Sequence, residues 1–152
     1  MVREKPFGRS RVVIECVSPE VDGGAFPAKR VVGEIVTAEA DIFTDGHDVI
    51  SAVVLHKQDQ AVDWSEVRMQ PLVNDRWRGT FNVEALGFHR FTIEAWVDHF
   101  LTWHRDLKKR VDGGASEEEL GVQLLIGLAH LRAAAAPASG RDRRELAAVI
   151  AV

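Results

Sequence analysis

The stretch DRWRGTFNVEALGFHRFTIEAWV, residues 75–97, decides the fold class of this chain. Its first run, residues 75–83, alternates apolar and polar side chains, and its second run, residues 88–97, does the same. The apolar side of the first run consists of Trp77, Gly79, Phe81 and Val83. A period of two is typical of a β-strand with one buried and one solvated face. Because only EALG separates the two runs, the sequence predicts an antiparallel hairpin with Trp77 and Phe81 in the core.

Four stretches before this hairpin also have strand character. They are residues 11–17, 35–43, 49–57 and 65–72. Turn-forming residues such as those of TDGHD, residues 44–48, separate them. Six short strands at this spacing predict a mainly β fold, built as an antiparallel β-sandwich. Cys16 alternates with Val12 and Ile14 in the first strand, so we expect it to be a small buried side chain.

The last third of the chain has the apolar period of helices. Ser116 and Glu119 fit a capping box, which predicts that a helix begins there. One face of that helix carries Leu120, Leu124, Leu128 and Leu131. Val122, Leu125 and Ile126 widen this face beyond a single stripe. Pro137 interrupts the alanine run, and a last helix after Ser139 has a narrow apolar edge.

These patterns divide the chain into three parts. Residues 1–10 are predicted to be an N-terminal tail, residues 11–103 a β-sandwich, and residues 104–152 a C-terminal helical hairpin. A shorter helix over residues 105–110 is expected to lead from the strands into the helical part, because DGG follows at 112–114.

Composition excludes several classes of function. A chain of 152 residues can bury one core, and a net charge of −4 offers no basic surface for nucleic acid. No apolar run is long enough to predict a membrane span. Cys16 is the only cysteine, so an internal disulfide is excluded, and we expect a cytoplasmic location. No motif for a cofactor, a metal or a nucleophile is present, so no catalytic, cofactor-binding or metal-binding residue is predicted.

The segment EAWVDHFLTWHRDLKK, residues 94–109, carries aromatic, imidazole and carboxylate groups together. It lies where the strand period gives way to charges at helical spacing. Trp96, Phe100 and Trp103 are interpreted as apolar side chains that fill the junction, with a ligand platform as the alternative. His99 and His104 are five residues apart, a spacing that suits neither a strand face nor a helix face for metal binding.

Two carboxylates of the same segment could have either a catalytic or a structural role. Asp98 and Asp106 could form an acid–base pair, but the sequence shows no substrate cleft around them. Solvated carboxylates or caps at a helix start are the preferred interpretation.

A series of motifs in order along the chain resembles one enzyme family. The motifs are Pro19, Gly24, FPAK at 26–29, VVGE at 31–34, DGHD at 45–48, RWRGTF at 76–81, AWVD at 95–98, TW at 102–103 and LLIG at 124–127. Together they resemble the N-terminal region of the bacterial maltose-1-phosphate maltosyltransferases. These enzymes of the α-amylase superfamily extend α-1,4-glucans by maltosyl units.

The resemblance implies more than composition does. It implies an immunoglobulin-like sandwich with a helical insertion, and it implies that the catalytic carboxylates belong to a barrel for which 152 residues have no room. We therefore expect a non-catalytic fragment of a glycosyltransferase. Its expected partners are a second copy, through the helix of Leu120, Leu124, Leu128 and Leu131, and the catalytic barrel of the parent enzyme.

Two other classes of function remain as alternatives. A glucan-binding module would stack sugar rings on exposed tryptophans, and candidates for contacts with carbohydrate or a neighbouring domain are Trp64, Trp96, Asp98 and Trp103. Trp77 is a further candidate for the stacking role. Flat, open indole rings would favour this class, and enclosed rings would argue against it. A small stand-alone hydrolase would need a cleft with convergent titratable groups.

Overall fold

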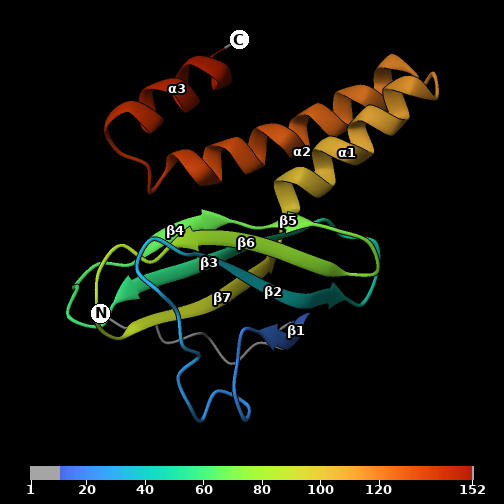
Figure 1. The fold of residues 1–152 in the computed structure, drawn as a ribbon. Coiled ribbons are helices and arrows are strands. Elements are labelled where there is room, and N and C mark those ends of the chain that lie inside the picture. Colours follow the sequence, from blue (N-terminus) through green and yellow to red (C-terminus); the bar gives the residue numbers. More distant parts are fainter. Residues whose placement is uncertain (1–10, 152) are drawn as a thin grey trace. The chain divides into compact units, whose positions relative to one another are not determined.

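A computed structural model describes residues 11–151 of the chain. The chain separates into two compact units that divide between Val97 and Asp98. The first unit contains the strands and the second contains the helices (Figure 1). The predicted tail, residues 1–10, lies outside the described residues.

The strand unit is mainly antiparallel β structure. Its strands are β1 (Val12–Ser18), β2 (Ile35–Thr44), β3 (Ile50–Gln58), β4 (Ser65–Arg68), β5 (Gln70–Pro71), β6 (Arg76–Asn82) and β7 (His89–Val97). Among the described residues they form two sheets, ordered β1-β2-β6-β5 and β4-β3-β7. Each stretch that the sequence marked as a strand contains one, so the mainly β class is confirmed.

The predicted hairpin between residues 75–83 and 88–97 is wrong. β6 pairs with β2 and β5, whereas β7 pairs with β3 in the other sheet. The apolar faces were assigned correctly, because Trp77 and Phe81 are buried and Phe91 packs against the same core. The four residues EALG connect two facing sheets here, and alternation along a strand does not indicate which strand lies beside it.

The predicted strand over residues 65–72 is divided between the two sheets. β4 pairs with β3, and β5 pairs with β6. Met69 lies between them, 2% exposed, and its backbone N–H donates to the Ala52 carbonyl at 2.9 Å. A buried methionine at this point anchors the chain as it passes from one sheet to the other.

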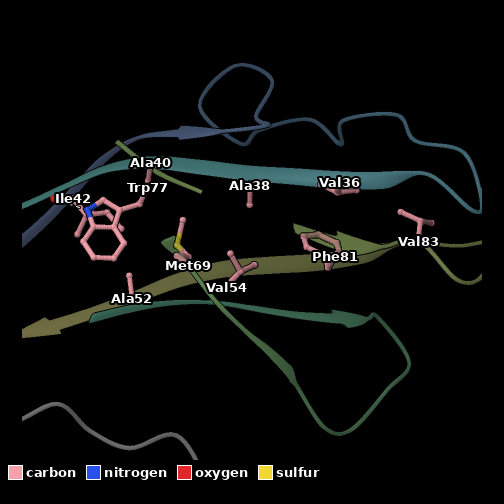
Figure 2. Packing of buried hydrophobic residues seen from close by; sticks show 10 residues of the cluster. All are labelled: Val36, Ala38, Ala40, Ile42, Ala52, Val54, Met69, Trp77, Phe81 and Val83. Carbon is pink, nitrogen blue, oxygen red and sulfur yellow. Dashed lines mark hydrogen bonds between the residues drawn. The ribbon is translucent and has the colours of Figure 1, made fainter. Parts of the chain in front are cut away.

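The core lies between the two sheets (Figure 2). Its buried members are Val36, Ala38, Ala40, Ile42, Ala52, Val54, Met69, Trp77, Phe81 and Val83. Three alanine side chains in this set let the sheets approach closely. Gly79 has the same effect, because a Cβ built there would lie 2.7 Å from Val54 Cγ2.

Cys16 is exposed, which corrects the expectation of a buried side chain. The pairing of β1 with β2 shifts register between Glu15 and Ser18, and Cys16 has a φ of 51°. A bulge of this kind changes which side chains face inward. A hydrogen bond with Asp41, together with the negative charge of that carboxylate, raises the pKa of the Cys16 thiol.

Arg76 links the bulge in β1 to the neighbouring strand β2. Its guanidinium lies 3.2 Å from Glu39 Oε2 and 3.1 Å from Asp41 Oδ1, and it donates to the Cys16 carbonyl at 3.0 Å. The Arg76 pKa is raised, mainly by its hydrogen bond with Asp41. The charged residues on this outer face therefore have structural partners.

The helical unit consists of α1 (His99–Asp112), α2 (Glu117–Ala135) and α3 (Gly140–Ile150). The capping box of Ser116 and Glu119 is confirmed, with both reciprocal hydrogen bonds present. α1 begins at His99, earlier than the expected helix over residues 105–110. The strands end at Val97, so residues 99–103, predicted to be part of the sandwich, belong to this helix instead.

α1 and α2 meet where the indole of Trp103 lies against Gly127. The Trp103 Nε1–H donates to the Gln123 carbonyl at 2.7 Å. A Cβ at Gly127 would lie only 2.0 Å from Trp103 Cζ2. The glycine thus leaves the space that the indole occupies. Among the described helices, none combines the length and apolar character needed to cross a membrane.

Candidate functional site

The four tryptophans have different surroundings. Trp77 is 8% exposed and its Nε1–H donates to the Ile42 carbonyl at 3.1 Å, which confirms its predicted place in the core. Trp103 is partly buried within the helical unit. Trp64 and Trp96 are 43% and 40% exposed. Only these last two have the exposure that a stacking platform needs.

A cation lies over each exposed indole. Lys57 Nζ is 5.2 Å from the ring centroid of Trp64, and the Arg68 guanidinium carbon is 5.7 Å from that of Trp96. Cation–π contacts of this kind hold a flat side chain in place and cover one of its faces. Trp96 lies on β7, whereas Trp64 precedes β4.

Asp98 caps α1. Its Oδ1 accepts the Leu101 backbone N–H at 2.9 Å, which agrees with the preferred interpretation of a helix-start cap. Asp106 pairs with Arg105, whose hydrogen bond lowers the Asp106 pKa. Neither carboxylate is therefore placed as a general acid. Within the described residues, no three His, Cys, Asp or Glu side chains gather as a metal site, and His99 and His104 belong to no such group.

The described strand unit contains a mainly apolar groove with a volume of about 870 Å³. The first half of β7, the loop 19–32, the β6–β7 connection and β1 form its walls. Core residues Val36, Phe81 and Val83 reach its floor. The groove therefore opens directly onto the packed interior.

Exposed apolar side chains line this groove. They are Phe26, Val32, Trp64, Leu86 and Phe88, between 43% and 86% exposed. Apolar groups gathered on one surface usually mark an interaction site. Lys29 and Arg30 add positive charge along the wall that the loop 19–32 supplies. The lining is therefore mainly apolar, with charged side chains of both signs, because Glu20 and Arg90 also belong to it.

A second, smaller cavity of about 640 Å³ lies beside His56 and His89. The His56 ring stacks on Phe81, with centroids 4.3 Å apart and planes 12° from parallel. Burial lowers the His56 pKa, and the nearby Glu84 carboxylate opposes that shift. His89 Nε2 lies 3.0 Å from the Ala85 carbonyl oxygen. Both imidazoles therefore have packing roles at this end of the core.

The groove was not predicted from the sequence. Trp64 was named as a candidate contact, but Phe26, Leu86 and Phe88 were not, although each is a large apolar residue in or next to a turn. That position was the available signal, because turns are usually polar. The segments that form the groove are distant in the sequence, so only the folded chain brings them together.

The described residues define a class of protein: an antiparallel β unit with an apolar groove and a separate helical unit, without a group of three His, Cys, Asp or Glu side chains that could hold a metal ion among those residues. Comparison with known proteins then gives the family. Residues 10–152 match the family model described as alpha-1,4-glucan:maltose-1-phosphate maltosyltransferase, domain N/S. The chain belongs to this family, as the sequence resemblance predicted.

Several curated relatives support the assignment. The chain is 46% identical over 140 residues to the maltosyltransferase of Chlorobaculum tepidum, which covers 91% of this chain and 20% of the relative. It is 47% identical over 131 residues to that of Myxococcus xanthus, covering 84% of this chain and 19% of the relative. The chain thus spans about 20% of the length of these relatives.

Proposed function

We propose that this chain is the non-catalytic N-terminal structural and dimerisation domain of a maltosyltransferase. The parent enzyme would transfer maltosyl units from maltose 1-phosphate to α-1,4-glucans. The observation that carries the proposal is the match of residues 10–152 to domain N/S of that family. A structural role is also supported by Asp98, whose carboxylate caps α1, and by Asp106, which pairs with Arg105.

The proposed fold of the strand unit is an immunoglobulin-like sandwich. In that fold the strands A, B, E and D form one sheet, and C, F and G form the other. The order β1-β2-β6-β5 corresponds to A-B-E-D, and β3 and β7 take the places of C and F. β4, beside β3, corresponds to the additional strand C′.

The proposed association surface is helix α2. Its exposed side includes Val122, Leu124, Leu125 and Ile126, which are 42–67% exposed. Leu120, Leu128 and Leu131 are partly buried. An apolar stripe of roughly 100° suffices for a helix that packs on one neighbour, and α2 exceeds it. A second copy related by a two-fold axis could cover the remainder.

The dimer is tested with charge substitutions on α2. We expect the wild-type chain to have twice the monomer mass in light scattering, and Leu124→Glu with Leu125→Glu to give a monomer. Burying a leucine is worth about 1.5–3 kcal/mol, and a buried carboxylate reverses that gain. Val62→Glu, at a side chain 89% exposed on the strand unit, is the control and should remain dimeric. A monomeric wild-type chain would refute this surface.

Catalytic inertness is a separate expectation. The purified chain should release no phosphate from maltose 1-phosphate and should not shorten or extend α-1,4-glucan, because the resemblance places the catalytic carboxylates in a barrel. The measurement is phosphate release and glucan chain length over a long incubation. Turnover that persists after removal of contaminating amylases would contradict the non-catalytic role.

A glucan-binding module is the second candidate, and the half-exposed rings of Trp64 and Trp96 favour it. Trp103 and Asp98 are less suited, because the first donates to Gln123 and the second caps α1. Docking to the catalytic barrel of the parent enzyme is also proposed. The expected cytoplasmic location stays a prediction.

A further inference from the structure

The imidazole of His56 takes a place in the core that the strand pattern would give to an apolar side chain. Ala52 and Val54, which precede it on the inward face of β3, are fully buried. The His56 ring stacks on Phe81 of β6, with centroids 4.3 Å apart. Phe91 of β7 is opposite His56 in the register, and its ring lies 6.1 Å from that of Phe81. A titratable ring thus packs between three strands at this end of the core.

Titratable groups from the surrounding elements line the cavity of about 640 Å³ beside His56. They are Lys57 of β3, Asp63 before β4, Glu84 after β6 and His89 of β7. Lys57 already has a partner, because its Nζ donates to the Ala61 carbonyl at 2.9 Å. Asp59 and Arg90, at the same end of the sheet, form an ion pair with each other. A change of charge on the ring would therefore take place inside a cavity with established contacts.

The packed arrangement favours the neutral form of His56. Burial lowers the pKa of this ring below its ordinary value of about 6.5, the Glu84 carboxylate raises it, and His89 lowers it further. A cation–π contact with Phe81 would also favour the charged ring. Both N–H groups of an imidazolium need acceptors, however, and water supplies them better than an aromatic face does.

The direction of the pH dependence follows from this balance. Above about pH 6.5 the ring is neutral in both the packed and the hydrated arrangement, so the stacking contributes fully. As the pH falls from that value through the lower pKa of the packed ring, the hydrated arrangement takes up the proton first. The stabilisation that His56 supplies is then lost.

We propose that His56 is a pH-sensitive switch, whose protonation releases its ring from Phe81 and loosens the adjoining ends of β3 and β7. The pairing of these strands finishes only two residues beyond His56, with Gln58 opposite His89, and β4 begins at Ser65, opposite His56 itself. Strand ends open more readily than strand centres. Phe81 also lines the groove of about 870 Å³, so a movement of its ring changes both hollows.

The test follows the ring and the backbone of the 152-residue chain between about pH 8 and about pH 5. NMR of the histidine ring protons should give His56 a pKa below about 6.5. Amide exchange, corrected for the intrinsic effect of pH, should become about tenfold faster at residues 54–58 and 89–93 on acidification. Ala38 and Ala40, which are fully buried on β2, should keep their protection.

Three variants make the test specific to His56. His56→Phe keeps an aromatic ring that cannot be charged, so exchange at residues 54–58 and 89–93 should no longer depend on pH. Glu84→Gln, at an exposed position, removes the carboxylate that favours the charged ring and should move the transition to lower pH. His104→Gln, at an exposed position on α1, should respond to pH as the wild type does.

Three results would overturn the proposal. They are a His56 pKa at or above about 6.5, an equal acceleration of exchange in His56→Phe, and a loss of protection at Ala38 and Ala40 at the same pH as at the ends of β3 and β7. The last result would mean that the whole strand unit unfolds and that no switch exists. Neither the helix α2 nor catalytic activity enters these measurements, so they are independent of the proposed function.

Discussion

Phe81→Ala is expected to lower the free energy of unfolding of the strand unit by about 3–5 kcal/mol. Phe81 is 7% exposed and lies between the two sheets (Figure 2). Its ring stacks on His56 and lies 6.1 Å from the ring of Phe91. The substitution removes these contacts and leaves a cavity that the rigid sheets cannot close, which adds to the lost burial of apolar surface.

The measurement is unfolding in urea. The slope of the free energy of unfolding against urea concentration is compared between variants, to confirm that the same amount of surface becomes exposed. Phe88→Ala is the control, because Phe88 is 68% exposed and its loss should change stability by about 0.5 kcal/mol or less. A loss below about 1 kcal/mol for Phe81→Ala would mean that this face of β6 is solvated.

Gly127→Ala is expected to destabilise the packing of α1 on α2 by about 1–3 kcal/mol, the usual cost of overfilling a packed site. The new Cβ would lie 2.0 Å from Trp103 Cζ2, so the indole has to move. An indole is rigid, and its displacement also breaks the 2.7 Å hydrogen bond to the Gln123 carbonyl. These losses exceed the gain of about 1 kcal/mol that alanine brings to a helix interior.

Gly121→Ala on the same helix is the matched control. A Cβ at Gly121 has no neighbour within 4 Å, so only the helix preference remains and the substitution should stabilise by about 0.5–1 kcal/mol. Thermal unfolding followed by circular dichroism at the helix signal compares the two. Equal effects of the same sign would show that the indole does not depend on Gly127.

Local features of the chain could be predicted from its sequence. Alternation in residues 75–83 identified Trp77 and Phe81 as core residues, and both are buried. Ser116 and Glu119 identified the start of α2, and the capping box forms. Such features depend on groups within one strand or one turn, so the sequence contains all the information that they require.

The partners of each strand were decided by tertiary structure. The same alternation fits a hairpin or two strands in facing sheets, and burial of both apolar faces against each other favoured the second arrangement. The bulge before Ser18 turned Cys16 outward, and Met69 divided one predicted strand between two sheets. The groove beside β7 joins residues from Ile14 to Ile93. By itself the sequence determined the faces and caps; pairing and the groove depend on long-range packing between segments that the sequence leaves far apart.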